Sequence, residues 1–165
     1  MKKVFFLAAL LVCSIAAQAQ RFALVDMEYI LKQIPAYEQA NQQMESLSKQ
    51  WQSEVEAKAQ EAKTMYDEYQ KNASNLSATQ KTAQENAIIA KEKEAADLRK
   101  KYFGPEGEGM KKRQELITPI QDAIYNAIKD IATQKNYDAV IDRASAQSMI
   151  FASPRIDISN EVLAK

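Results

Sequence analysis

Apolar residues recur at steps of three and four along the middle of the chain, which is the spacing of one face of a helix. Pro35, a residue suited to the first turn of a helix, precedes this stripe. The stripe covers about forty residues, or about 60 Å at ~1.5 Å per residue. Because it is unstable alone in water, it predicts a long helix that packs against a partner helix. The stripe consists of Tyr37, Ala40, Met44, Leu47, Trp51, Val55, Ala59, Ala62, Tyr66, Tyr69, Ala73 and Leu76.

The partner helix is expected to follow in the same chain. Residues 76–80 are predicted to form the tip, with Ser77 as helix cap and Gln80 three residues later, the spacing of a capping box. The returning helix is predicted from about Ala78 to Phe103. Its apolar seam is thin, so we expect the outer arm to be loosely held and mobile. The seam residues are Ile88, Ala95 and Tyr102, with Leu98 between them, while Gln84 and Lys91 take the alternate positions.

All three glycines of the chain lie between residues 104 and 109, so this segment is predicted to interrupt the returning helix. A phosphate-binding loop would need a lysine and a hydroxyl residue after a strand, whereas Met110 and Lys111 follow a helix. We therefore interpret the segment as a kink or hinge. Its hinge residues are Gly104, Pro105, Gly107 and Gly109.

A third helix is predicted from about Met110 to Lys135, with a stronger apolar stripe than the arm has. Pro119 lies inside it without ending the pattern, so a local bend is expected there. This end of the hairpin is predicted to belong to a hydrophobic core. The stripe consists of Leu116, Ile117, Ile120, Ile124, Ile128 and Ile131.

Short strands are predicted at both ends of the chain. The first is the apolar run after Arg21, closed by Asp26, which is expected to cap a brief helix over residues 27–33. Residues 137–142 and 148–153 are two further strand candidates. Residues 157–159 should cap a last short helix over 160–164. The predicted core of this β-body consists of Phe22, Leu24, Val25, Val140, Ile141 and Ile150.

The predicted fold is mainly α, with a long antiparallel helical hairpin, a coiled-coil arm, inserted between N- and C-terminal strands. Residues 20–35 begin the β-body, 36–109 form the arm, and 110–165 complete the body. Two or three short strands with little helix to cover them make a marginal core in one chain. Association of several copies would supply the missing burial, so an oligomer is expected.

The N-terminus has the pattern of a signal peptide, with two lysines, an apolar run over residues 4–15 and Ala17-Gln18-Ala19. Cleavage is predicted after Ala19, which exports the chain. The apolar run is about a dozen residues, short of the ~20 that cross a bilayer, so no stable membrane insertion is expected. The alternative, lipidation of Cys13, is disfavoured because Val12 is a poor residue before such a cleavage point.

Composition excludes several function classes. Loss of residues 1–19 removes two lysines and no acid, so the formal charge falls from 0 to −2, which predicts no nucleic-acid binding. The chain has no histidine and its one cysteine lies in the signal peptide, so no enzyme, metal or cofactor site is predicted. Asp26, Asp138 and Asp142 near the strand ends are interpreted as capping and turn residues rather than paired catalytic carboxylates.

Several segments, in order, resemble the Skp/OmpH family. They are residues 24–31, in which Val25-Asp26 ends a strand before a short helix, and residues 136–142 followed by 157–163 near the C-terminus. Residues 103–116 are similar to a segment of members from Bacteroidetes-type bacteria. The resemblance spans the whole mature chain. It implies a homotrimer with a small β-body, from which three hairpins project around a cavity.

The resemblance also implies a function. Family members hold unfolded outer-membrane proteins in the periplasm without ATP. The family's enterobacterial member is strongly basic whereas this chain is near neutral, so capture of acidic clients or lipopolysaccharide does not follow. The alternative is an exported coiled-coil structural or adaptor protein that binds no unfolded chain. The arm residues predicted to contact clients are Met44, Trp51, Met65, Tyr66 and Tyr69, which at helical spacing are also typical of a seam between two helices.

Overall fold

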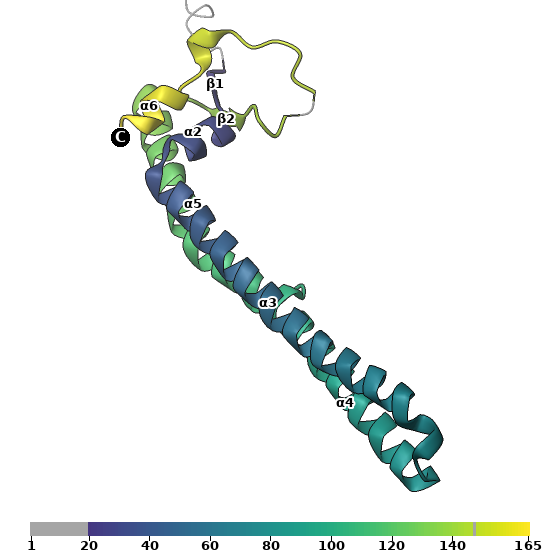
Figure 1. The fold of residues 1–165 in the computed structure, drawn as a ribbon. Coiled ribbons are helices and arrows are strands. Elements are labelled where there is room, and N and C mark those ends of the chain that lie inside the picture. Colours follow the sequence, from purple (N-terminus) through teal and green to yellow (C-terminus); the bar gives the residue numbers. More distant parts are fainter. Residues whose placement is uncertain (1–19, 147) are drawn as a thin grey trace, which may run out of the picture. The chain divides into compact units, whose positions relative to one another are not determined.

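The computed structural model describes residues 20–146 and 148–165, so the predicted signal peptide lies outside the described residues. Long helices dominate the fold, and the strands are short (Figure 1). The elements in chain order are β1 (Phe22–Val25), α2 (Met27–Gln33), α3 (Pro35–Asn72), a 3-10 turn (Ala73–Asn75), α4 (Ala78–Phe103), α5 (Glu108–Lys135), β2 (Ala139–Asp142), a 3-10 turn (Pro154–Ile156) and α6 (Ser159–Leu163).

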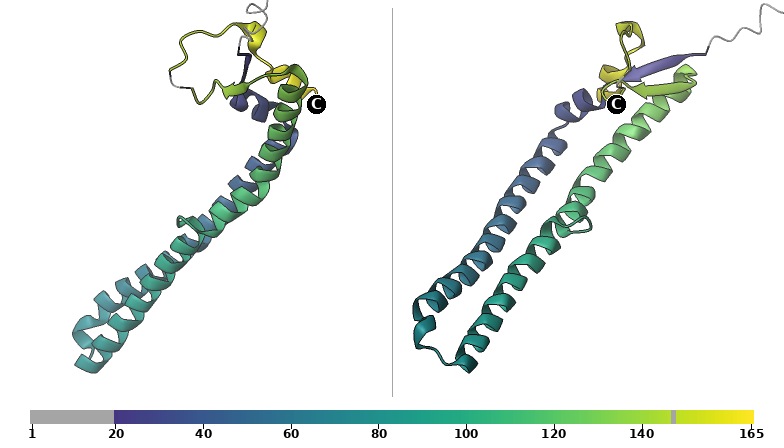
Figure 2. Two further views of the ribbon diagram at one scale, coloured as in Figure 1. Left: turned by 180° about the vertical axis from the view of Figure 1, so that it is seen from behind. Right: turned by 90° about the vertical axis from the view of Figure 1, so that its right-hand side faces the viewer.

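The helices α3 and α4 form the predicted antiparallel hairpin and pack against each other (Figure 2). Pro35 is the first residue of α3, and α4 covers the predicted residues 78–103. The capping box is confirmed: Gln80 N donates to Ser77 Oγ at 3.3 Å, and Ser77 N donates to Gln80 Oε1 at 2.9 Å. Local hydrogen bonds, which the sequence spacing predicted, therefore fix the start of α4 at the tip.

The returning helix is interrupted between Phe103 and Glu108, as predicted. The next helix, α5, begins at Glu108, two residues before the predicted start, and continues through Pro119. It ends at Lys135, where Asn136 adopts a φ of 53°, a left-handed conformation that asparagine tolerates. This turn lets Tyr137 N donate to the carbonyl oxygen of Ala132 at 2.9 Å and leads the chain into β2.

The sheet consists of β1 and β2, which pair in parallel with Phe22 opposite Ala139 and Val25 opposite Asp142. The other edge of β1 forms an isolated parallel bridge between Leu24 and Asp157. Ile158 N donates to the carbonyl oxygen of Leu24 at 2.9 Å. The first strand is therefore paired on both sides, by segments more than a hundred residues later in the chain.

The predicted strand over residues 148–153 is wrong for the single chain, in which these residues are not in a strand. Both edges of β1 are occupied, so the segment has no ladder partner there. Ile150 is 101% exposed and Phe151 is 84% exposed. An apolar run of this length is compatible with a strand, but a strand also needs a neighbour with free backbone groups.

The hydrophobic core of the sheet region is small. Within β1, Leu24 and Val25 are 3% exposed, and α2 packs against α6. Ile30 of α2 and Ile131 of α5 are fully buried. The remaining buried apolar residues around them are Ala23, Ile124, Ile158 and Val162.

The chain divides into two compact units. One, which we call the body, comprises the described residues up to Ile34 together with Asp122–Lys165. The other, the arm, is Pro35–Gln121. The arm thus extends beyond the predicted end at residue 109, because α5 is continuous and its first half is part of the same unit.

Candidate functional site

The seam of the arm is built from most of the predicted stripe, whereas Ala59 and Tyr66 of that stripe are exposed. Val55 and Ala62 of α3 and Ile88 and Ala95 of α4 are each 5–8% exposed. Small alanines occupy this seam beside single large residues, so each helix contributes little apolar area per turn. The outer hairpin therefore has the thin seam that the sequence indicated.

An aromatic cluster strengthens the seam next to the helix break. The rings of Trp51 and Tyr102 are stacked, with centroids 5.1 Å apart and 12° between their planes, and Phe103 meets Trp51 edge-on at 6.4 Å. Val55 is buried with them, and Leu47 and Leu98 pack against the cluster. Trp51 is only 8% exposed, so it packs the hairpin together rather than offering a surface to a partner.

A hydrogen bond anchors this cluster across the seam. Tyr102 Oη donates to Glu54 Oε2 at 2.6 Å, and Gln50 also donates to the Glu54 carboxylate. The bond from Tyr102 lowers the pKa of Glu54, helped by Gln50 and by the charge of Lys101. The same bond raises the pKa of Tyr102.

The stability of the arm should therefore depend on pH at both ends of the scale. Because the pKa of Glu54 is lowered from 4.5, its contribution is complete above that pH and is lost as pH falls through the folded value. Because the pKa of Tyr102 is raised from 10.0, its contribution is complete below that pH and is lost as pH rises through the folded value. Thermal unfolding followed by Trp51 fluorescence at several pH values measures both limbs.

Tyr102→Phe is the control for this pH dependence. It keeps the stacked ring and removes the hydroxyl, so the stability difference from the parent should be largest at neutral pH and shrink below pH 4.5 and above pH 10.0. A constant difference across this range would contradict the proposed coupling between Glu54 and Tyr102.

The glycine-rich break is tightly packed against its neighbours. Gly104 N donates to the carbonyl oxygen of Lys100 at 2.9 Å, and a Cβ on Gly104 would overlap that oxygen. A Cβ on Gly109 would lie 2.9 Å from the carbonyl oxygen of Tyr102 and 3.4 Å from the Trp51 ring. Glycine is therefore required by close approach at these positions. Movement at Gly104, Pro105, Gly107 and Gly109 stays a prediction.

The other predicted contact residues of the arm differ in exposure. Tyr66 is 46% exposed, whereas Met44, Met65 and Tyr69 are half-buried. Tyr69 Oη donates to the carboxylate of Glu85 across the hairpin, which raises the pKa of Tyr69. Of the predicted set, Tyr66 alone offers a large exposed apolar surface.

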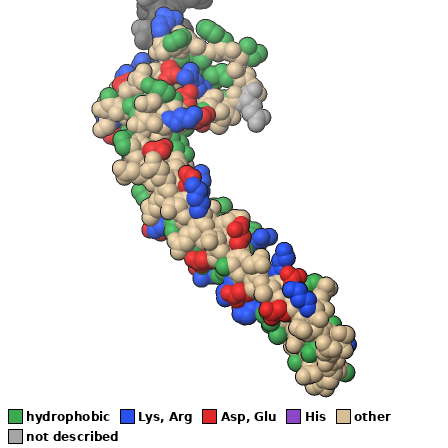
Figure 3. Space-filling model, in the orientation of Figure 1, with side chains coloured by type: hydrophobic (Ala, Val, Ile, Leu, Met, Phe, Trp, Pro, Cys, Tyr) green, Lys and Arg blue, Asp and Glu red, His purple; other side chains and the backbone are tan. Residues whose placement is uncertain are grey.

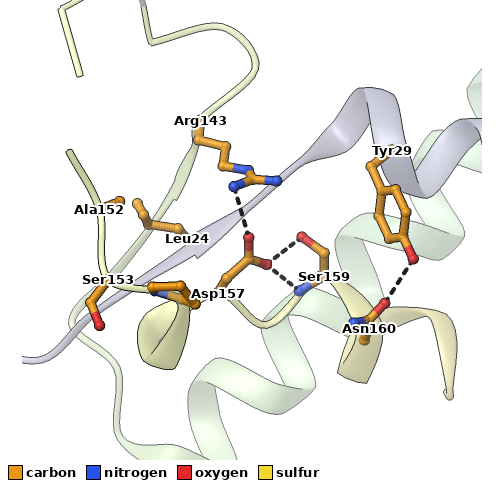
Figure 4. A pocket seen from close by; sticks show the side chains of 9 residues that line it. Leu24, Tyr29, Arg143, Ala152, Ser153, Asp157, Ser159 and Asn160 are labelled. Carbon is orange, nitrogen blue, oxygen red and sulfur yellow. Dashed lines mark hydrogen bonds and ion pairs between the residues drawn. The ribbon is translucent and has the colours of Figure 1, made fainter. Parts of the chain in front are cut away.

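A cavity of about 330 Å³ lies in the body beside β1 (Figure 4). Arg143 pairs there with Asp26 at 3.0 Å and with Asp157 at 3.4 Å. Asp157 accepts hydrogen bonds from Ser159 N at 2.9 Å and Ser159 Oγ at 2.6 Å. Burial opposes ionisation of Asp157, but these bonds and Arg143 outweigh it and lower its pKa. The charged side chains at this cavity are therefore already paired with one another.

The capping role predicted for Asp26 and the turn role predicted for Asp142 are confirmed, whereas Asp138 binds a backbone N–H far away in the sequence. Asp26 Oδ1 accepts from Tyr29 N at 2.8 Å, and Asp138 Oδ2 accepts from Arg21 N at 2.7 Å. Asp142 Oδ1 accepts from Met27 N at 3.2 Å and from Ala144 N at 3.0 Å. These carboxylates accept hydrogen bonds from backbone N–H groups, which is a structural role.

Only part of the predicted body core is buried within one chain. Leu24 and Val25 are buried and Val140 is half-buried. Phe22 and Ile141 are 43% and 41% exposed, and Ile150 is fully exposed. These three side chains are therefore not buried within one chain. Their place in an assembled core stays a prediction.

Two absences concern the described residues, 20–146 and 148–165. No group of three or more cysteine, aspartate or glutamate side chains there is arranged to hold a metal ion. None of the helices in this part of the chain combines the length and the apolar character needed to cross a membrane.

These features define a class of protein that combines a long helical hairpin with a small parallel sheet. Within that class, the chain belongs to the family described as outer membrane protein (OmpH-like), whose profile matches residues 21–165. This confirms the family resemblance noted in the sequence, and the structure confirms the mainly helical fold with a small sheet. The homotrimer that the resemblance implied stays a prediction.

Curated relatives of the chain carry the description "Chaperone protein Skp". The protein from Yersinia enterocolitica is 29% identical over 155 residues, covering 93% of this chain and 90% of its own. The protein from Photorhabdus luminescens is 30% identical over 127 residues, covering 77% and 75%. A solved OmpH-like structure from Caulobacter crescentus CB15 is similar in fold, with a TM-score of 0.69 at 11% identity over 90% of this chain and 85% of that one. The family therefore includes chaperones.

Proposed function

We propose that this protein is an ATP-independent periplasmic holdase chaperone. It binds unfolded outer-membrane β-barrel proteins between coiled-coil arms and prevents their aggregation. The observation that carries the proposal is the similarity to chaperones over nearly the whole chain, which includes the hairpin. The resemblance stated for residues 24–31 and 103–116 supports the same conclusion.

The surface of the arm suits weak, repeated binding. On the face seen in Figure 3, basic and acidic side chains are interspersed along the hairpin with hydrophobic ones between them. Such shallow contacts release a client without an energy source, and several arms around one client raise the effective concentration of each contact. The thin alanine-rich seam supports arms that adjust to clients of different size.

We also infer a homotrimer formed through the body. Four apolar side chains there are exposed in one chain: Phe22, Ile141, Ile150 and Phe151. A two-stranded sheet is marginal by itself, and burial of these side chains against other copies would supply the missing core. In the trimer, residues 148–153 gain the strand partner that the single chain lacks.

The test uses the exported chain from Gln20 to Lys165. A urea-unfolded outer-membrane β-barrel protein is diluted into buffer with and without it, and light scattering and complex mass are measured. We expect suppressed aggregation and a discrete complex of three copies with one client. Undiminished aggregation beside an intact oligomer would instead identify a structural or adaptor protein of the cell envelope.

A further inference from the structure

Arg21, the residue just before β1, is held by contacts with the segment that leads into β2. Arg21 N donates a hydrogen bond to Asp138 Oδ2 at 2.7 Å, and Asp138 N donates to the carbonyl oxygen of Arg21 at 2.8 Å. The guanidinium of Arg21 also lies over the Tyr137 ring, 5.5 Å from its centroid. Both the backbone and the side chain of Arg21 are therefore bound to the body.

Gln20, by contrast, is exposed and forms no hydrogen bond or ion pair with the other described residues, 21–146 and 148–165. The strand β1 begins two residues later, at Phe22. The predicted cleavage after Ala19 makes Gln20 the first residue of the exported chain. Cleavage at this point therefore leaves one unattached residue in front of an anchored residue, and the unattached residue is a glutamine.

We propose that Gln20 of the exported chain is a modification site, where the side chain and the new α-amino group close into a pyroglutamyl ring. An α-amino group is partly uncharged near neutral pH, so its nitrogen is nucleophilic. This nitrogen attacks the side-chain carbonyl carbon Cδ, and a bond from nitrogen to Cδ forms. The bond from Cδ to Nε2 breaks, one proton of the α-amino group passes to the leaving nitrogen, and ammonia departs. The reaction consumes no oxidant, reductant or second substrate.

The fold permits this reaction without loss of structure. Ring closure uses only the α-nitrogen and the side chain of Gln20, which have no partner among the described residues. The peptide bond between Gln20 and Arg21 is unchanged, so the hydrogen bond from Arg21 N to Asp138 is kept. A glutamine inside β1 could not close the ring in this way, because its nitrogen would belong to the ladder.

The ring protects the contacts that hold the start of β1. An aminopeptidase requires a free α-amino group, and the first two residues that it removes from an unmodified chain are Gln20 and Arg21. Loss of Arg21 removes two hydrogen bonds with Asp138 and the contact with Tyr137. A blocked terminus therefore preserves the anchor in front of the first strand.

Mass spectrometry of the natural N-terminus tests the proposal. The protein is isolated from the cells that produce it and cut after lysine, which releases residues 20–32. We expect this peptide to be lighter than the unmodified sequence by the mass of one ammonia in most molecules. A synthetic peptide of the same sequence, carried through the same steps, should stay mostly open. A free Gln20, an N-terminus at another residue, or equal ring content in protein and synthetic peptide would overturn the proposal.

Gln20→Ala, made in the same cells, is the matched variant because alanine leaves the α-amino group free. Ring closure removes the charge of that group, so isoelectric focusing should place the parent at lower pH than the variant, by the loss of one positive charge. Equal isoelectric points would contradict the ring in the parent. The proposal rests on cleavage after Ala19 and is independent of client binding, so failure of the parent to suppress aggregation leaves it standing.

Treatment with an aminopeptidase measures the protective effect. We expect the parent to keep its mass, whereas Gln20→Ala loses residues 20 and 21 and then melts at a lower temperature. Equal shortening of the two chains would show that the parent is not blocked. An unchanged melting temperature of the shortened variant would show that Arg21 does not stabilise the start of β1.

Discussion

Val25→Asp is expected to unfold the body and abolish assembly while leaving the helices of the arm largely intact. Val25 is 3% exposed in β1, a strand whose two edges are both paired. A carboxylate at this position would be buried without a partner, at a cost of more than about 4 kcal/mol. The arm is a separate compact unit with its own seam, so its helices do not depend on this strand.

Hydrogen exchange and far-UV circular dichroism measure this result together. Amides of β1 and α6 should lose protection, whereas α3 and α4 keep theirs and the helical signal falls little. Ile150→Asp is the control, since Ile150 is fully exposed in one chain and its replacement should affect assembly alone. A folded, assembled Val25→Asp variant would show that β1 is not part of the core that the copies share.

The elements of the arm could be predicted closely because their signals are local. Pro35 is the first residue of α3. The start of α4 is fixed by hydrogen bonds between Ser77 and Gln80, which are three residues apart. The apolar stripe predicted most of the seam for the same reason, since helical periodicity depends only on nearby sequence, although Ala59 and Tyr66 of the stripe are exposed. Capping by Asp26 was predictable on the same local basis.

Features that depend on distant partners were harder to predict. Residues 148–153 have the composition of a strand, but the second edge of β1 is taken by Asp157, a pairing that sequence does not reveal. Trp51 was a candidate for contact with clients, and its burial depends on Tyr102, on the other helix of the hairpin. Ile89 and Phe103, which are 61% and 44% exposed, were missed as surface residues. The signal that would have found them is their seven-residue spacing with Ala96, each one position after a seam residue.

Trp51→Ala is expected to destabilise the arm by about 3–5 kcal/mol, because a buried, stacked indole is lost and the seam cannot fully collapse onto the cavity. The ring contacts Tyr102 and Phe103 and lies against Gly109, so it links α3 to both sides of the helix break. Its loss should increase hydrogen exchange in α4 near Tyr102 and at the start of α5, which exchange mass spectrometry measures.

Tyr66→Ala is the matched control for this prediction, an aromatic residue of the same helix that is 46% exposed. It should change stability by less than about 1 kcal/mol, since little buried area is lost. Unchanged hydrogen exchange around the helix break in Trp51→Ala would mean that the aromatic cluster does not stabilise the break. If exchange rises as expected, the break is clamped to α3 by the aromatic cluster. Any opening of the arm at Gly104–Gly109 must then first separate Trp51 from Tyr102, which fluorescence of this sole tryptophan reports directly.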